Sequence, residues 1–161
     1  MKLYGYWRSS AAYRVRIALN LKGISAEQFS VHLVRDGGEQ HKAAYIALNP
    51  LELVPTLVVD DELDVDALSQ SLAIIEYLDE IHPQSPLLPA SALERAHVRA
   101  MALTVACEIH PLNNLRVLQY LTQTLGADDT AKNTWYHHWV ASGFTALETL
   151  LTRHSGRYCF G

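Results

Sequence analysis

The sequence has little cysteine and no excess of basic charge. Two cysteines, Cys107 and Cys159, occur in 161 residues, and no Cys-x-x-Cys pair is present. Lys and Arg together number 13 against 17 Asp and Glu, so the formal net charge is −4. Dithiol redox chemistry, which needs paired cysteines, is therefore excluded, and nucleic-acid binding, which needs a basic surface, receives no support. We interpret both cysteines as reduced, buried thiols.

Long apolar runs are also missing. No window reaches the length of a membrane span, and the first residues lack the apolar stretch of a secretory signal. No internal repeat or low-complexity segment occurs. With 49% apolar and 19% charged residues, the chain has the composition of a globular protein that buries a core. We expect a cytoplasmic protein with no nucleic-acid or membrane partner.

Metal-ligand spacing is equally scarce. His137 and His138 are adjacent, so they point apart on a helix. No His-x-x-x-His or spaced Cys/His pattern occurs elsewhere in the sequence. We therefore expect no metal site.

What the sequence does contain is a strand that turns into a helix at two serines. Residues 1–6 alternate in the manner of a short strand, and apolar residues recur at helical spacing from Val15 until Gly23 supplies a stop. Ser9 or Ser10 is a natural N-cap for this helix. The first turn of a helix offers unpaired N–H groups and a partial positive charge, so an anion fits there.

Three arginines surround this turn, at Arg8, Arg14 and Arg16. Their charge adds to that of the helix terminus and favours a thiolate, carboxylate or phosphate partner. The alternative is that the serines only cap the helix, which needs no ligand.

The following segments predict a mixed sheet covered by helices. Their order, β-α-β-α-β-β-α, matches the thioredoxin-like layout with a four-stranded mixed sheet. We expect Ser69-Gln70-Ser71 to cap the last helix of this series. That helix has Leu72, Ile75 and Leu78 on one side, with Ile74 and Ile81 beside them. The predicted strands are 1–6, 29–34, 56–59 and 67–68, and a turn is predicted at 60–62. The predicted helices begin at the two serines, at residue 39 (ending at 48) and after the 69–71 cap.

A proline-rich stretch, residues 83–91, predicts a linker between residues 1–82 and an all-helical domain at 92–161. In that domain His110-Pro111 interrupts a run from 92 to about 108, and Gly126 ends the next run at 112–125. Asp128-Asp129 caps a third run. Its apolar stripe is Trp135, Trp139, Leu147, Leu150 and Leu151.

Trp7-Arg8-Ser9-Ser10 and Arg14-Val15-Arg16-Ile17-Ala18-Leu19 resemble the signature of zeta-class glutathione transferases. Further similar segments are residues 36–40, 49–50, 54–57, 70–78 and 111–115. The family commonly has Cys and Trp where this chain has Ala11 and Tyr13. The resemblance implies a glutathione transferase fold, in which a helical domain follows the thioredoxin-like domain and runs on beyond the Tyr158–Gly161 point. We therefore expect the helical domain here to be incomplete.

The resemblance implies that glutathione is the cofactor. Ser9, Ser10 and Arg8 become the catalytic candidates, with Ser9 donating to the sulfur, and Arg8 and Arg116 become the candidates for holding carboxylates. The implied glutathione-binding residues are Ser9, Ser10, Ala11, Arg14, Gln40, Val54, Gln70, Ser71, His110, Asn114 and Arg116.

Several of these residues also have a simpler interpretation. The resemblance implies a cis Val54-Pro55 bond whose backbone faces the ligand, although trans is the commoner form of an X-Pro bond. Gln70-Ser71 begin a second helix and suit a carboxylate, or act as caps alone. Gln40 follows Gly37-Gly38 in a loop expected to be flexible, and is equally consistent with plain solvent exposure. His110 is equally consistent with a histidine at a helix break.

The activity implied by the resemblance is glutathione-dependent cis–trans isomerisation of maleylacetoacetate to fumarylacetoacetate, in tyrosine and phenylalanine breakdown, by a homodimer. One alternative is isomerisation of maleylpyruvate, or general glutathione transfer. Another is a non-catalytic thioredoxin-like binding module. The Arg8-Ser9-Ser10 and Gln70-Ser71 pairs argue against the last, because a scaffold alone needs neither.

Overall fold

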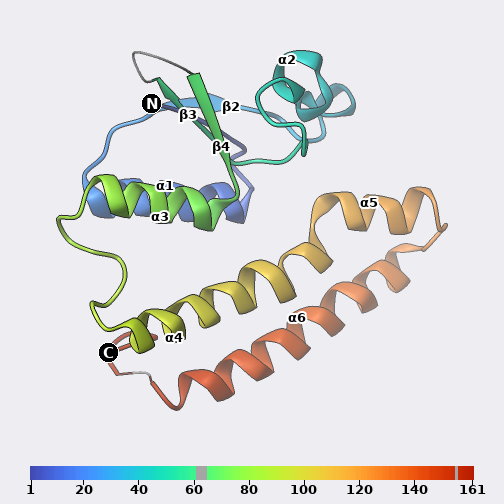
Figure 1. The fold of residues 1–161 in the computed structure, drawn as a ribbon. Helices are drawn as coiled ribbons and strands as arrows, with labels where there is room; N and C mark the ends of the chain where they lie inside the picture. Colours follow the sequence, from blue (N-terminus) through green and yellow to red (C-terminus); the bar gives the residue numbers. More distant parts are fainter. Residues whose placement is uncertain (61–64, 155) are drawn as a thin grey trace. The chain divides into compact units, whose positions relative to one another are not determined.

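A computed structural model gives the fold and describes residues 1–60, 65–154 and 156–161. The chain forms two compact units, Met1–Leu87 and Leu88–Gly161 (Figure 1). Within the described ranges, no helix is both long enough and apolar enough to cross a membrane.

The first unit contains a four-stranded mixed sheet with strand order β2-β1-β3-β4. Its elements are β1 Lys2–Gly5, α1 Ser10–Lys22, β2 Glu27–Ser30, α2 Ala43–Ile46, β3 Thr56–Asp60, β4 Val65–Ser69 and α3 Ser71–Ile81. β1 is parallel to β2, and β3 is antiparallel to both β1 and β4. The parallel pair needs a crossover, which α1 supplies. The predicted element order and mixed sheet are confirmed.

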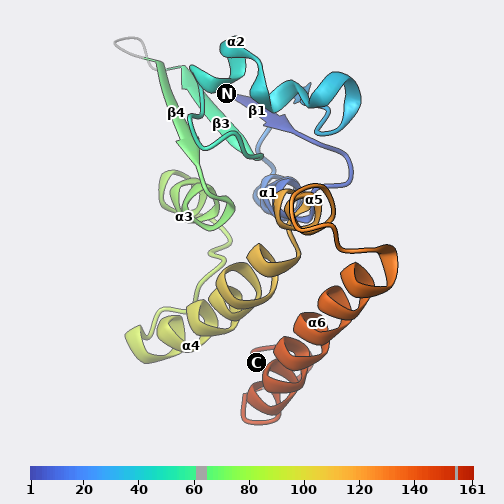
Figure 2. The ribbon, with the colours of Figure 1, turned by 90° about the vertical axis from the view of Figure 1, so that its right-hand side faces the viewer.

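Helices α1 and α3 lie side by side over one face of the sheet (Figures 1 and 2). Leu3 of β1 and Leu57 of β3 are register partners, so strand alternation points both side chains to the same face. They form the core with Val15 and Leu19 of α1 and with Ile74 and Leu78 of α3. All six side chains are almost fully buried, and each such burial stabilises the fold by about 1.5–3 kcal/mol.

The buried face of α3 differs from the predicted one. Ile74 and Leu78 are fully buried, whereas Leu72 and Ile75 are half-buried and Ile81 is 43% exposed. Residues 74 and 78 are one turn apart and face α1, so the apolar side of α3 is rotated from the predicted Leu72-Ile75-Leu78 stripe.

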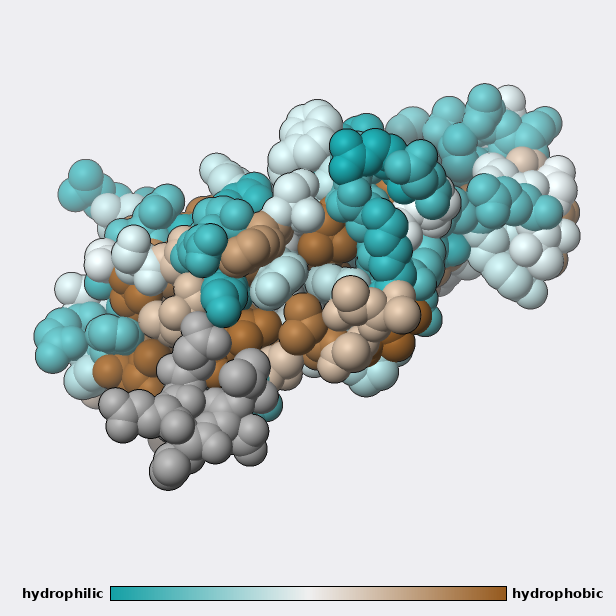
Figure 3. All heavy atoms as spheres, turned by 90° about the horizontal axis from the view of Figure 1, so that it is seen from above, coloured by the Kyte–Doolittle hydropathy of each residue, from teal (hydrophilic) through white to brown (hydrophobic). Residues whose placement is uncertain are grey.

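The opposite face of the sheet carries aromatic side chains. Tyr4 stacks on Phe29 with ring centroids 4.9 Å apart, and the Tyr45 ring from α2 lies 6.2 Å from Tyr4. Seen from this side, apolar residues gather next to hydrophilic ones (Figure 3). This face is therefore partly covered by the α2 segment rather than by a long helix.

Two predicted segments of the first unit are wrong in extent. The second strand was predicted at 29–34 and is found at Glu27–Ser30. β1 ends at Gly5, the register partner of Ser30, so the chain beyond residue 30 has little strand left to pair with. The helix predicted at 39–48 divides into a 3₁₀ turn, Glu39–His41, and α2, because Lys42 between them is extended. Of the predicted turn at 60–62, residues 61 and 62 lie outside the described residues.

The second unit is helical, as predicted. It contains α4 Ala92–Leu103, a π-helical segment Thr104–Ile109, a 3₁₀ turn Pro111–Asn113, α5 Leu115–Gln123 and α6 Asp129–Leu151. Ile109 packs against Gly143 of α6 so closely that a Cβ at position 143 would lie 2.3 Å from its side chain. Trp135 of α6 donates from Nε1 to the Leu112 carbonyl at 2.8 Å. These contacts fasten α6 to the segment that follows α4.

Both cysteines are free and exposed, so the prediction that they are buried is wrong. Ile109 faces α6. Cys107 lies two positions before it in the same helical segment, so its side chain points away from α6. Cys159 lies beyond the end of α6.

The first residues of the proline-rich stretch are fixed to the first unit by Lys22. The Nζ atom of this side chain donates to the carbonyls of His82 at 2.8 Å and Gln84 at 3.2 Å, and forms an ion pair with Asp79. Asp79 also accepts from the Leu87 N–H at 3.0 Å. The Lys22 side chain is 0% exposed, so this ion pair is shielded from water.

Replacing Lys22 tests this arrangement. Lys22→Met should lower the free energy of unfolding of the protein by about 3 kcal/mol, because it removes the buried ammonium group that pairs with Asp79 and donates to two carbonyls. Lys132→Met, which removes an ion pair to the exposed Asp129, should cost about 1 kcal/mol or less. Urea unfolding of both variants gives the comparison. Equal small losses would show that the Lys22 contacts contribute little.

Candidate functional site

Ser9 is the N-cap of α1. Its backbone is extended, with φ −74° and ψ 114°, and its Oγ accepts a hydrogen bond from the Ala12 N–H at 3.1 Å. Ser10 is the first helical residue and is exposed. A serine hydroxyl has two acceptor positions and one donor hydrogen, so Ser9 holds the helix end while its O–H can still donate. The structure therefore distinguishes the two serines that the sequence left as alternatives.

Sheet topology brings the ends of several strands to one edge. β1 and β4 are both antiparallel to β3, so they are parallel to each other, and α1 and α3 begin where these two strands end. The register pairs Tyr4 with Thr56 and Thr56 with Ser69. Val54 precedes Thr56 by two residues, and Gln70 follows Ser69. The start of α1, the Val54 segment and the start of α3 therefore meet at one edge of the sheet.

Arg14 connects the two helix starts directly. Its Nη1 atom donates to Ser71 Oγ at 3.1 Å, across 57 residues of sequence. Arg8 and Arg16 instead lie over aromatic rings, with Arg8 5.6 Å from the centre of Trp7 and Arg16 5.3 Å from that of Tyr13. Arg8 is exposed beside the Ser9 turn. The site thus has one cation between the helix starts and another next to the cap.

The start of α3 is built differently from that of α1. Gln70 occupies the N-cap position with φ 69°, in the left-handed region, and its side chain makes no capping hydrogen bond. The prediction that residues 69–71 cap α3 by their side chains is therefore wrong for Gln70. Ser71 is buried at 6% exposure and receives the Arg14 hydrogen bond. The first-turn N–H groups of α3 suit an anionic ligand group for the reason given for α1.

The Val54–Pro55 peptide bond is cis, as the resemblance implied. The preceding carbonyl, that of Leu53, accepts from Tyr45 Oη at 2.6 Å and from Asn49 Nδ2 at 2.8 Å. Burial raises the pKa of the Tyr45 hydroxyl, so it stays protonated as a donor. Neither partner was predicted from the sequence, in which residues 49–50 stood out only as a segment similar to the family.

Gln40 is buried, at 6% exposure, so the alternative of plain solvent exposure is wrong. Its Nε2 donates to the Leu33 carbonyl at 3.3 Å, and its Oε1 is buried without a hydrogen-bond partner. Gly38, with φ 104°, leaves room for this amide, because a Cβ at position 38 would lie 2.5 Å from Gln40 Nε2. An unsatisfied buried oxygen of this kind is consistent with a group that completes its bonding with a ligand.

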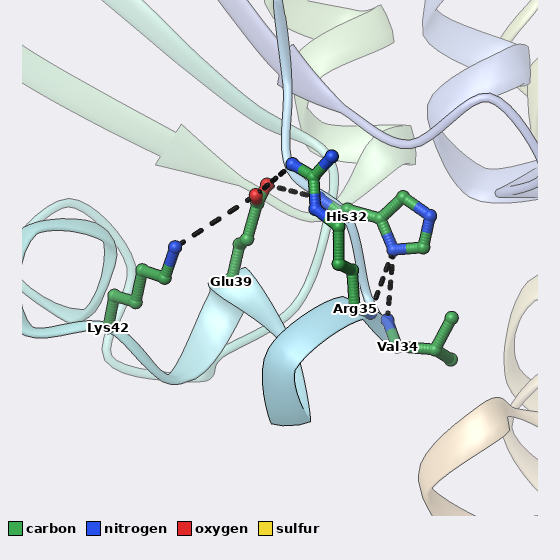
Figure 4. A network of polar contacts seen from close by, with 5 residues as sticks. All are labelled: His32, Val34, Arg35, Glu39 and Lys42. Carbon is green, nitrogen blue, oxygen red and sulfur yellow. Dashed lines mark hydrogen bonds and ion pairs between the residues drawn. The ribbon is translucent and has the colours of Figure 1, made fainter.

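A network around Glu39 holds the loop that carries Gln40 (Figure 4). Glu39 Oε2 accepts from the His32 N–H at 2.7 Å, and Oε1 accepts from Arg35 Nη2 at 2.5 Å. Lys42 Nζ lies 3.9 Å from the same carboxylate. The His32 hydrogen bond, followed by that from Arg35, lowers the pKa of Glu39 to about 2. His32 Nδ1 in turn accepts from the N–H groups of Val34 and Arg35.

The remaining predicted residues lie in the second unit. Asn114 is the N-cap of α5, with its Oδ1 accepting from the Arg116 N–H at 3.2 Å. Asn114 Nδ2 and His110 Nε2 are 3.5 Å apart, so the two side chains are neighbours. Arg116 is exposed in the first turn of α5.

No metal centre is evident in the part of the chain that the structure describes. Within those ranges, no group of three or more His, Cys, Asp or Glu side chains gathers closely enough to hold a metal ion. The candidate site is thus a set of hydrogen-bond donors and cations, a chemistry suited to an organic anion.

The pKa of Glu39 makes a prediction about acid stability. Because this pKa falls from 4.5 in the free side chain to about 2 in the folded protein, its bonds stabilise the loop above about pH 4.5 and are lost as the pH falls towards 2. Glu39→Gln should flatten the fall of the free energy of unfolding over this range, measured by urea unfolding. Arg35→Gln should flatten it less, since the His32 hydrogen bond remains. An unchanged pH slope in Glu39→Gln would contradict the assignment.

Comparisons with known proteins agree with this geometry. Residues 3–86 match the family described as "Glutathione S-transferase, N-terminal domain". The chain is 58% identical to a probable maleylacetoacetate isomerase of Vibrio cholerae, over 99% of this chain and 72% of that protein. It is 51% identical to a maleylpyruvate isomerase of Ralstonia sp, over 100% of this chain and 74% of that protein.

A solved structure of maleylacetoacetate isomerase from Methylobacterium extorquens AM1, with bound malonate and glutathione, is similar with a TM-score of 0.92 and 43% identity. The similarity covers 100% of this chain and 74% of that protein. A plant protein from Euphorbia esula, 42% identical over 100% of this chain and 68% of that protein, is named a zeta-class glutathione S-transferase. This chain therefore belongs to the glutathione S-transferase family, in its zeta class of glutathione-dependent isomerases.

Proposed function

We propose that this chain converts maleylacetoacetate to fumarylacetoacetate, with glutathione as a catalytic thiol, in tyrosine and phenylalanine breakdown. The observation that carries the proposal is the meeting of three segments at one sheet edge: the Ser9 cap, the Val54 segment and the start of α3. Glutathione has a thiol, a peptide backbone and an α-carboxylate. Each of these groups has a matching partner at that edge.

The residues of the first unit fit glutathione group by group. Ser9 at the start of α1 suits the thiolate, since a hydroxyl donor and a helix N-terminus both favour a negative sulfur. Ser10 and Ala11 lie in the same first turn. Gln70 and Ser71 suit the α-carboxylate, with Arg14 adding positive charge. Val54 offers its backbone, and the buried Gln40 Oε1 is an acceptor still lacking a donor.

When bound, glutathione supplies a thiol that adds to the cis double bond and leaves again after rotation. Ser9 keeps that sulfur ionised by donating its O–H. Arg8, exposed beside the cap, and Arg116, in the first turn of α5, are the candidates for holding the substrate carboxylates. Charge that develops on the substrate oxygen during addition is stabilised by these cations.

His110 and Asn114 are assigned to the glutathione site as polar groups of the helical unit. Their side chains lie next to each other, and Asn114 is fixed by its capping bond to the Arg116 N–H. A fixed rotamer such as that of Asn114 suits a binding role, because little side-chain freedom is lost when the ligand binds. The homodimer and the cytoplasmic location that the resemblance implies belong to the same proposal.

Maleylpyruvate is the second candidate substrate. The 51% identity to a Ralstonia maleylpyruvate isomerase supports it nearly as well as the first candidate. Both substrates are cis-dicarboxylates that need a thiol and two cations, so the site residues assigned above serve either reaction. Assay of both substrates with one protein preparation decides between them.

Ser9→Ala should lower turnover by at least about tenfold, because a hydrogen bond to a charged group contributes about 1.5–3 kcal/mol. It should also cost about 1 kcal/mol of folding free energy through the lost cap. Ser10→Ala should matter less for activity and for stability, since the N-cap hydrogen bond from the Ala12 N–H goes to Ser9. Steady-state kinetics and thermal unfolding measure both effects. An inactive Ser10 variant beside a normal Ser9 variant would reverse the assignment.

An isomerase returns its glutathione, whereas a transferase consumes one molecule per turnover. With catalytic glutathione, the cis substrate should be converted completely while free thiol, titrated before and after, stays constant. Arg8→Leu should weaken this reaction at least about tenfold, and weaken conjugation of a neutral electrophile far less, because only the former has a carboxylate to hold. Loss of thiol in proportion to product would support the general transferase activity instead.

A further inference from the structure

The loop between α2 and β3 is held by a buried polar network of Tyr45, Asn49 and Thr56. We infer that these three are positioning residues, which aim the backbone N–H of Val54 at glutathione. The inference rests on the proposed function, in that Val54 is taken as a glutathione-binding residue. It concerns side chains to which no role has been assigned above.

Tyr45 and Asn49 both donate to one carbonyl, and the Thr56 hydroxyl is hydrogen-bonded to each of these two side chains. The Leu53 oxygen accepts from Tyr45 Oη at 2.6 Å and from Asn49 Nδ2 at 2.8 Å. Thr56 Oγ1 lies 2.9 Å from Tyr45 Oη and 3.0 Å from Asn49 Nδ2. Asn49 Oδ1 accepts from the Leu51 N–H at 3.1 Å, so both ends of its amide are used.

The three side chains of the network are buried. Tyr45 is 5% exposed, Asn49 is 2% exposed and Thr56 is fully buried. Water therefore cannot replace a lost hydrogen bond at no cost, and each bond restricts the direction of its partner strongly. Thr56 is also the first residue of β3, paired with Tyr4 and Ser69, so the network is fixed to the sheet itself.

The geometry of the peptide unit links this network to Val54. The Leu53 carbonyl and the Val54 N–H belong to one planar unit, and in a trans peptide they point in opposite directions. Two hydrogen bonds hold the carbonyl towards Tyr45 and Asn49, which lie in and just after α2. The Val54 N–H is thereby directed away from the network. A ligand with an extended backbone can accept from it as an added strand does.

A network that only stabilised the fold would have a different experimental signature. Its loss would lower the free energy of unfolding but leave the affinity of the folded protein for glutathione unchanged. Loss of a positioning network lets the 53–54 peptide rotate. Half-saturation then needs more glutathione, while turnover at saturation, which depends on Ser9 and the arginines, stays nearly constant.

The experiment compares Tyr45→Phe and Thr56→Val with two controls. Thr56→Ser keeps the bridging hydroxyl, and Tyr4→Phe removes a hydroxyl from the ring beside Tyr45 without altering the bonds to Leu53. Isothermal titration with glutathione gives the dissociation constant, and isomerase assays give kcat and the half-saturating glutathione concentration. Tyr45→Phe and Thr56→Val should each raise both concentrations by about five- to tenfold, with kcat within about twofold. Thr56→Ser and Tyr4→Phe should stay within about twofold of the parent.

Each outcome decides between the two roles. Unchanged glutathione affinity in a folded Tyr45→Phe protein would overturn the inference and leave the proposed function intact. If Thr56→Val does not fold, Tyr45→Phe alone carries the test, because it retains the ring and the Asn49 hydrogen bond. A parent protein that does not bind glutathione would overturn the proposed function and the inference together.

Discussion

The pairing of Leu3 with Leu57 in the centre of the sheet is the contact on which the first unit depends. These two residues project from β1 and β3 to the same face, and α1 and α3 pack over them. Any shift of one residue in this register would turn the apolar side chains to the other face of the sheet. The register that buries the core is therefore also the register that sets Tyr4, Thr56 and Ser69 beside one another.

That alignment produces the electrostatics of the site. Both α1 and α3 begin at the same sheet edge, so the partial positive charges of two helix N-termini lie close together, and Arg14 adds a full charge between them. Such an arrangement disfavours the empty site and favours an anionic ligand. The protein has a net charge of −4, so the attraction is a property of this edge and not of the whole surface.

The loops at this edge are fixed by polar contacts of two kinds. The loop that carries Gln40 depends on the partly exposed Glu39 carboxylate, whose bonds respond to pH. The Val54 segment depends on neutral, buried groups whose bonds do not titrate near neutral pH. In the second unit, a polar contact also fixes Asn114, whose side chain caps α5.

The sequence determined the features that depend on near neighbours. The strand-to-helix turn at Ser9, the stop at Gly23, the element order and the helical second unit were all predictable, because capping, periodicity and turn residues act over a few positions. It did not predict the end of β2, the burial of Gln40 or the exposure of Cys107. Tertiary structure alone decided these features, because each depends on which residues the fold brings together from separate parts of the sequence. The same holds for the hydrogen bonds from Arg14 to Ser71 and from Tyr45 to the Leu53 carbonyl.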